Sequence, residues 1–112
     1  MRLKMICALA VVATPAAAQE ITVEGMARTA SVTSAIVQFC GAYYLIDGPK
    51  AAKMSAAARE LALQNAPPGR GKALVNAEFK RRLREVEVTQ SSNWCQNQRE
   101  IQRNLGTHLF LN

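Results

Sequence analysis

The chain has 112 residues, of which 49% are hydrophobic and only 5% are aromatic, and it carries a formal net charge of +6 at pH 7. This length indicates one domain with a small core. The low aromatic content argues against the stacking platforms that bind single-stranded nucleic acids, and a mild positive charge is not by itself a nucleic-acid signature. We therefore expect a single domain that has no nucleic-acid partner.

Residues 1–18 have the three parts of a secretory signal peptide. Arg2 and Lys4 form a basic start, an apolar run extends over Met5–Ala13, and Ala16–Ala18 fits the small-residue cleavage pattern. The apolar run is too short for a bilayer-spanning helix, which needs about 20 residues. We expect cleavage before Gln19, a periplasmic or secreted protein, and no transmembrane segment. Cleavage would leave residues 19–112, with 12 Lys and Arg against 8 Asp and Glu, a net charge of about +4.

Residues 19–28 are polar, and we interpret them as a flexible lead-in to a single helical domain over residues 29–112. Apolar residues recur at helical spacing along residues 29–46, which predicts the first helix of this domain. Tyr43 falls on the apolar stripe of that helix and is expected in the core. Tyr44 falls off the stripe and is expected on the surface.

A second helix is predicted over residues 49–66, after the helix breaker Asp47–Pro49. Its Ala, Lys, Met, Leu and Glu residues are good helix formers. The Pro- and Gly-rich stretch Asn65–Gly71 predicts a loop, and a third helix follows over residues 74–89. The apolar residues that are expected to face the core from these two helices are Met54, Ala58, Leu61, Ala62, Val75, Phe79, Leu83 and Val86.

The fourth helix is predicted over residues 92–105, with Gly106 as its C-cap. The polar stretch Gln90–Asn93 either caps this helix or is a weak point in one long helix that continues from the third. The tail, Thr107–Asn112, is apolar enough to fold back on the body. Helices of these lengths with short connections predict an all-α fold, a small antiparallel helical bundle of three to four helices.

Two cysteines, Cys40 and Cys95, remain after cleavage, and an even number in a small exported chain is typical of a disulfide. A bridge between them would close a loop that includes more than half of the mature chain. On chain-entropy grounds it would stabilise the fold by roughly 4 kcal/mol. Redox pairs usually lie close together as Cys-x-x-Cys, which this spacing does not match. We expect a structural disulfide, with intermolecular or metal-binding use of the thiols as the open alternatives.

A thiol-dependent enzyme would need Cys40 as its nucleophile and His108, the only histidine, as its base. A disulfide would consume Cys40, and His108 lies in the tail. A zinc site requires three or four Cys, His or carboxylate ligands, and one histidine with two separated cysteines does not provide a convincing set. We therefore expect no catalytic residues, no metal and no cofactor.

Cationic residues mark two candidate binding positions. Arg70 and Lys72 lie in a connector that lacks the residues of a phosphate-binding loop, but they could still bind an anion at the start of the third helix. Lys80, Arg81 and Arg84 lie in the densest charge run, which is either a solvated face or a patch that binds a partner. The ion pairs expected within this run are Glu78–Arg82, Arg81–Glu85 and Arg84–Glu87.

Trp94 lies in a stretch that is unusually rich in Asn and Gln, Ser91–Asn104. Exposed amides around a tryptophan can form a polar rim about an interface anchor, so Trp94 is also a candidate for partner binding. The alternative is that Trp94 fills the core beside the disulfide. The sequence leaves both interpretations open.

The absence of any recognisable catalytic constellation, together with the export signal, favours a non-enzymatic exported protein. Its partner would be a protein, an anionic envelope component or another anion, and a homodimer is also open. The layout resembles that of small periplasmic helical proteins with one disulfide, some of which are acid-stress chaperones, and this resemblance implies no functional residue. The alternatives are therefore a periplasmic stress chaperone or inhibitor that exposes apolar surface on a trigger, and a thiol-dependent enzyme.

Overall fold

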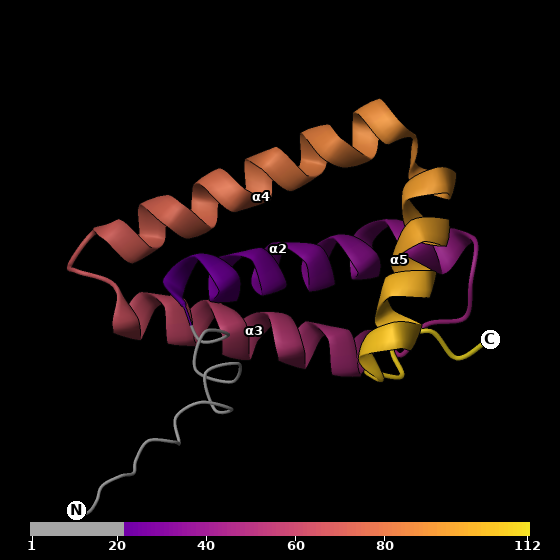
Figure 1. The fold of residues 1–112 in the computed structure, drawn as a ribbon, viewed down its shortest axis with the longest axis horizontal. Coiled ribbons are helices and arrows are strands. Elements are labelled where there is room, and N and C mark those ends of the chain that lie inside the picture. The colour runs from indigo at the N-terminus through magenta and orange to yellow at the C-terminus, as the bar shows by residue number, and fades with distance from the viewer. Residues whose placement is uncertain (1–21) are drawn as a thin grey trace, which may run out of the picture.

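The computed structural model describes residues 22–112, which form four α-helices and one short 3₁₀-helix (Figure 1). Their bounds are α2 Val23–Phe39, η2 Cys40–Ala42, α3 Gly48–Asn65, α4 Arg70–Thr89 and α5 Ser91–Leu105. The predicted all-α fold is confirmed for this part of the chain. The predicted signal peptide, residues 1–18, and residues 19–21 of the predicted lead-in lie outside the described residues.

Three long helices lie side by side, and α5 crosses one end of them (Figure 1). α2 lies between α3 and α4 and contacts both. α2 and α4 run in the same direction, and α3 runs antiparallel to them. The predicted antiparallel bundle is thus confirmed, with α5 lying across its end instead of along it. Figure 1 shows α4 diverging from α2 towards its C-terminal end, and two pockets open beside this part of α4. Within residues 22–112, no helix combines the length and the hydropathy that crossing a bilayer requires.

The start of α2 differs from the prediction. The Thr22 side chain accepts a hydrogen bond from the Gly25 N–H at 2.9 Å and caps the helix, and Met26 and Ala27 are buried against α3 and α4. The interpretation of a flexible lead-in is therefore wrong over residues 22–28. A local cap and tertiary burial extend the helix beyond the apolar stripe that the sequence shows.

The end of α2 also differs from the prediction, because the α-helix stops before Cys40 and a 3₁₀ turn redirects the chain. The turn reverses the expected roles of the two tyrosines. Tyr43 is 48% exposed, and its hydroxyl lies 3.0 Å from the hydroxyl of Ser91. Tyr44 packs against the core, with its ring edge-on to Phe110 at 5.7 Å between centroids. α-Helical spacing does not predict the exposure of the two tyrosines, because the chain forms a 3₁₀ turn here instead of another α-helical turn.

The junctions between the other helices follow local backbone chemistry. The Asp47 carboxylate accepts a hydrogen bond from the Lys50 N–H at 3.1 Å and caps α3. Gly69 has a φ of +83°, and α4 begins directly after it, earlier than the predicted start at residue 74. Gln90 has a φ of +75° and separates α4 from α5, so the two are not one continuous helix. Gly106 ends α5 in the left-handed region, as predicted.

The disulfide belongs to the larger of the two core clusters that residues 22–112 form. The sulfur atoms of Cys40 and Cys95 are 2.10 Å apart and the Cα atoms 5.5 Å apart, so the predicted pairing is confirmed. Both cysteines are fully buried, and Trp94 and Leu109 pack in the same cluster. The bond therefore joins η2 to α5 within the cluster that also contains Ile36 and Val86.

The tail folds back on the body, as the sequence predicts. Ile46 and Phe110 form an isolated antiparallel β-bridge. The Asp47 N–H donates to the Leu109 carbonyl at 2.8 Å, and the Leu111 N–H donates to the Leu45 carbonyl at the same distance. These bonds, with the fully buried Leu109, hold the tail against the segment between η2 and α3.

The apolar faces predicted for the second and third helices are correct in part. Ala58, Ala62, Val75 and Val86 are buried. Leu61 and Leu83, however, are 45% and 48% exposed. The predicted stripe is wider than the surface that the neighbouring helices cover.

Candidate binding site

The structure separates the six predicted partner-binding residues. Arg70 and Lys72 are exposed in the first turn of α4, at the end of the bundle away from α5 (Figure 1). Lys80, Arg81 and Arg84 lie farther along α4, and Trp94 lies in α5. The first pair therefore forms no common site with the other four.

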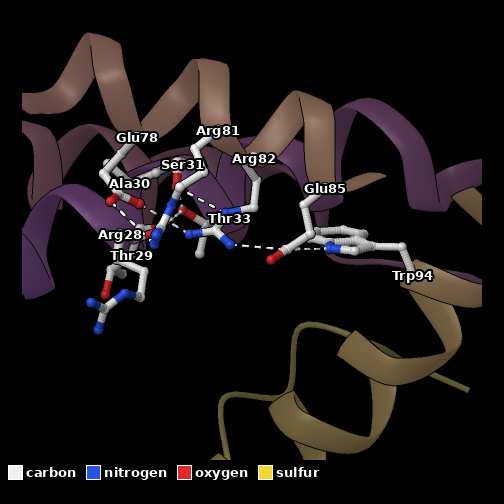
Figure 2. Close-up of polar contacts among 10 residues, drawn as sticks. All are labelled: Arg28, Thr29, Ala30, Ser31, Thr33, Glu78, Arg81, Arg82, Glu85 and Trp94. Atoms are coloured by element: carbon white, nitrogen blue, oxygen red, sulfur yellow. Dashed lines mark hydrogen bonds and ion pairs between the residues drawn. The ribbon is translucent and has the colours of Figure 1, made fainter. Parts of the chain in front are cut away.

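Arg81 and its neighbour Arg82 belong to an ion-pair network that faces α2 (Figure 2). Arg81 pairs with Glu78 at 3.3 Å, and not with Glu85 as the helical spacing suggested. The Arg82 guanidinium is buried and pairs with Glu78 at 3.1 Å and with Glu85 at 2.8 Å. Its Nε also donates to the Ser31 hydroxyl at 3.2 Å. Arg82 therefore links α4 to α2 and is not part of a solvated face.

Trp94 continues this network into α5. It is only 3% exposed, and its Nε1–H donates to the Glu85 carboxylate at 2.9 Å (Figure 2). The core interpretation of Trp94 is therefore correct, and the surface-anchor interpretation is wrong. The sequence could not show this, because Glu85 reaches Trp94 across the bend at Gln90.

Glu85 is the shared partner of Arg82 and Trp94. Partial burial by itself raises the pKa of the Glu85 carboxyl, but the hydrogen bonds from Trp94 and Arg82 and the charges of Arg82 and Arg81 outweigh burial. The pKa of Glu85 is therefore held below its ordinary value. At neutral pH the carboxylate remains ionised and keeps both contacts.

A first pocket, which we call the α4 groove, has a volume of about 780 Å³ and is lined by Phe39 of α2, by one face of α4, and by Gln90 and Ser91. Lys80 and Arg84 border it, beside the apolar side chains of Leu83 and Val86. Within residues 22–112, neither cation has a carboxylate within 4.0 Å, so the predicted Arg84–Glu87 pair does not form. Two of the predicted binding residues thus border an apolar groove, and the one carboxylate in its lining, Glu87, forms an ion pair with neither of them.

A second pocket, which we call the Trp94 pocket, opens on the other face of α4 and has a volume of about 560 Å³. α2, α4 and α5 form most of its wall, and Trp94 and Gln98 contribute from α5. Gln98 and Gln102 are the buried amides of the amide-rich segment, and both line the pocket. Helical spacing in the sequence places Gln98 on one face with Trp94 and Cys95, and the packing of α5 across the bundle buries that face.

The described residues give no support to thiol chemistry in the disulfide-bonded state. The Cys40 sulfur is bonded to Cys95, so it has no thiolate to act as a nucleophile. His108 lies in the tail and lines a smaller cavity beside Arg99 and Arg103. Within residues 22–112, no group of three His, Cys, Asp or Glu side chains is placed to hold a metal ion.

Comparison of the chain with protein-family models, with curated proteins and with solved structures finds no match. The geometry of the two pockets is therefore the main indication of function.

Proposed function

We propose that this is an exported, non-enzymatic helical protein that binds an acidic, amphipathic segment of a partner protein in the α4 groove. The observation that carries the proposal is that two cations without an ion pair within residues 22–112, Lys80 and Arg84, border an apolar floor and outnumber the one carboxylate in the lining, Glu87. The sequence of residues 1–18 supports export, to the periplasm or the medium.

The shape of the α4 groove favours a protein segment over the other anionic partners. A concave groove with Phe39, Leu83 and Val86 on its surface accommodates the apolar face of a helix, whereas a bilayer presents a flat surface. A volume of about 780 Å³ is also far larger than a simple anion requires. Acidic side chains on the edge of such a segment would reach Lys80 and Arg84. These contacts would orient the bound segment and increase its association rate.

Photo-crosslinking in the native host tests this proposal. A photoreactive residue replaces Leu83 in the groove, and a matched protein carries it at Leu63, which is exposed on α3 and lies outside the groove. We expect a discrete crosslinked protein from position 83 only. Adding Lys80→Glu and Arg84→Glu to the position-83 protein should abolish that product, because both cations become anions.

The same pair of charge reversals distinguishes the partner classes. Purified protein is mixed with vesicles of anionic and of zwitterionic lipid, and co-sedimentation is measured at low and high salt. The proposal predicts no retention beyond that of the charge-reversed variant. Charge-dependent retention on anionic vesicles without a crosslinked protein would contradict it and would identify an envelope surface as the partner. Equal crosslinking from positions 63 and 83 would also contradict it.

A second candidate function, a stress chaperone or inhibitor, has one observation in its favour. Large apolar side chains are exposed in the folded protein, among them Leu45 at 61%, Leu105 at 68% and Val88 at 78%. Such side chains can contact unfolded clients. This candidate predicts that acidification increases binding of an apolar dye and that the protein suppresses aggregation of a model client. If neither effect occurs, the candidate is wrong.

A further inference from the structure

The Trp94 pocket has the size and lining of a small-molecule site. Its volume of about 560 Å³ lies within the range of roughly 300–1,000 Å³ that is usual for ligand pockets. Met54, Ile101 and Leu105 contribute apolar surface, and Trp94 contributes its ring. Such a surface suits an apolar ligand. The polar groups in the pocket then determine which functional group that ligand carries.

Gln98 supplies a buried hydrogen-bond donor in this pocket. Gln102 Nε2 donates to Gln98 Oε1 at 3.3 Å, so the Gln98 oxygen is occupied. The Thr107 hydroxyl lies 2.9 Å from Gln102 Oε1 and 3.3 Å from the Gln102 carbonyl oxygen, the two acceptors for its proton. Gln98 is only 8% exposed, and within residues 22–112 no group accepts a hydrogen bond from its Nε2. A buried donor left without an acceptor costs free energy, so a ligand that brings an acceptor gains by supplying it.

The charges around the pocket favour an acceptor that is itself uncharged. Arg81 and Arg82 are matched by Glu78 and Glu85, so the network beside Trp94 is close to neutral. The remaining charge in the lining is Arg28, which is exposed. A carboxylate buried at Gln98 would lose its hydration without gaining a dedicated cation. An uncharged carbonyl oxygen loses much less hydration free energy when it is buried.

We propose that the Trp94 pocket binds a small apolar molecule that carries an uncharged carbonyl group, as in an ester or an amide. The carbonyl oxygen accepts a hydrogen bond from Gln98 Nε2, and the apolar part lies against Met54, Ile101 and Leu105. This site lies on the face of α4 opposite the α4 groove, so it is independent of the function proposed there.

Trp94 provides a direct assay, because it is the only tryptophan in the chain and lines the pocket. Its fluorescence is titrated with methyl octanoate and with octanamide, which separate an ester ligand from an amide ligand. Octanoate and octylamine serve as charged probes of the same length. We expect a saturable change with one or both of the uncharged carbonyl compounds, and weaker binding of octanoate and octylamine.

Gln98→Glu keeps the acceptor that Gln102 needs and replaces the free donor with a second acceptor. Methyl octanoate, which has no donor, should then bind about tenfold more weakly, as expected for the loss of one buried hydrogen bond. Ile101→Lys should also weaken binding by placing a charge on the apolar wall. Its matched control is Leu83→Lys, since Ile101 and Leu83 are 45% and 48% exposed and Leu83 lies in the other pocket. Circular dichroism melting confirms that each variant folds.

Four results would overturn the proposal. One is the absence of a saturable change with both methyl octanoate and octanamide. Another is tighter binding of octanoate than of either uncharged compound. The third is equal binding of methyl octanoate by the wild type, Gln98→Glu and Ile101→Lys, which would place the ligand elsewhere. Loss of binding in Leu83→Lys but not in Ile101→Lys would have the same meaning.

Discussion

At the scale of single residues, Glu85 holds together parts of the chain that the sequence does not show as neighbours. It accepts hydrogen bonds from Arg82 of α4 and from Trp94 of α5, and Arg82 in turn reaches Ser31 of α2 (Figure 2). One carboxylate thus connects three helices. Because Arg82 is buried, loss of Glu85 would leave its guanidinium with Glu78 as its one remaining carboxylate partner among residues 22–112.

Glu85→Gln should therefore destabilise the protein in a pH-dependent way. The pKa of Glu85 is lowered in the folded state, so its stabilising contribution is present above the ordinary glutamate pKa and is lost as the pH falls through the folded value. At pH 7 we expect a loss of about 1 kcal/mol, a modest value because the carboxylate is partly exposed. The loss should shrink as the pH falls through the lowered folded pKa of Glu85, where the wild-type carboxylate becomes protonated.

Urea unfolding of both proteins at neutral and acidic pH measures this difference. Glu87→Gln is the control, because Glu87 is exposed and forms no ion pair within residues 22–112. A difference between the wild type and Glu85→Gln that stays constant with pH would contradict the role assigned to the ionised carboxylate.

Gln90 adopts a backbone conformation that favours glycine. Its φ is +75° and its ψ is 135°, and its carbonyl accepts a hydrogen bond from the Trp94 N–H at 2.9 Å. Gln90→Gly should relieve the strain and keep that bond, and we expect a net stabilisation of about 0.5–1 kcal/mol. The control is Gln96→Gly within α5, which should destabilise by a similar amount because glycine weakens a helix interior. Thermal unfolding that shows Gln90→Gly to be the less stable of the two variants would contradict this interpretation.

At the scale of helices, Gly71 marks a close approach of α3 and α4. A Cβ at this position would lie 3.0 Å from the Ala62 carbonyl oxygen and 3.0 Å from the Leu63 Cα. Gly71→Ala should therefore destabilise the protein by about 1 kcal/mol or more, although alanine favours a helix by about that amount. Gly48→Ala is the matched control, because a Cβ there meets nothing within 4 Å. Chemical unfolding measures the stability of both variants. A gain in stability for Gly71→Ala as well as Gly48→Ala would contradict the prediction, because α3 and α4 would then separate at little cost in free energy.

The helices could be predicted from the sequence where local chemistry decides them. Pro49 and Gly106 mark a start and an end that the structure confirms within a residue. The apolar spacing also predicted that Val75 and Val86 are buried. These signals are local, so they need no knowledge of the neighbouring helices.

The features that could not be predicted from the sequence depend on contacts between segments that are distant in the chain. Tyr43 and Tyr44 exchange their expected roles because the chain turns at Cys40, and nothing in the apolar spacing indicates that turn. Arg82 is buried because α2 lies against it, whereas the charge pattern alone suggested a solvated face. The partnership of Glu85 with Trp94 likewise requires the bend between α4 and α5.

At the scale of the whole molecule, small side chains make up much of the core. The buried alanines are Ala27, Ala30, Ala35, Ala51, Ala58 and Ala62. They let the helices approach closely but bury little apolar area each, so the hydrophobic contribution per residue is small. A disulfide that joins η2 to α5 then contributes a large share of the net stability. Exposed leucines remain for contacts with a partner or with a second copy of the chain, and the homodimer stays a prediction.

We propose that the Cys40–Cys95 disulfide stabilises an exported binding protein and that neither sulfur performs thiol chemistry. The most direct test is the intact mass of the protein from the exported fraction of its native host, after thiol alkylation with and without reduction. We predict a chain that begins at Gln19, takes up no label before reduction and takes up two labels after it, without release from a larger species. Labelling of Cys40 before reduction, or a chain that retains residues 1–18, would contradict the claim.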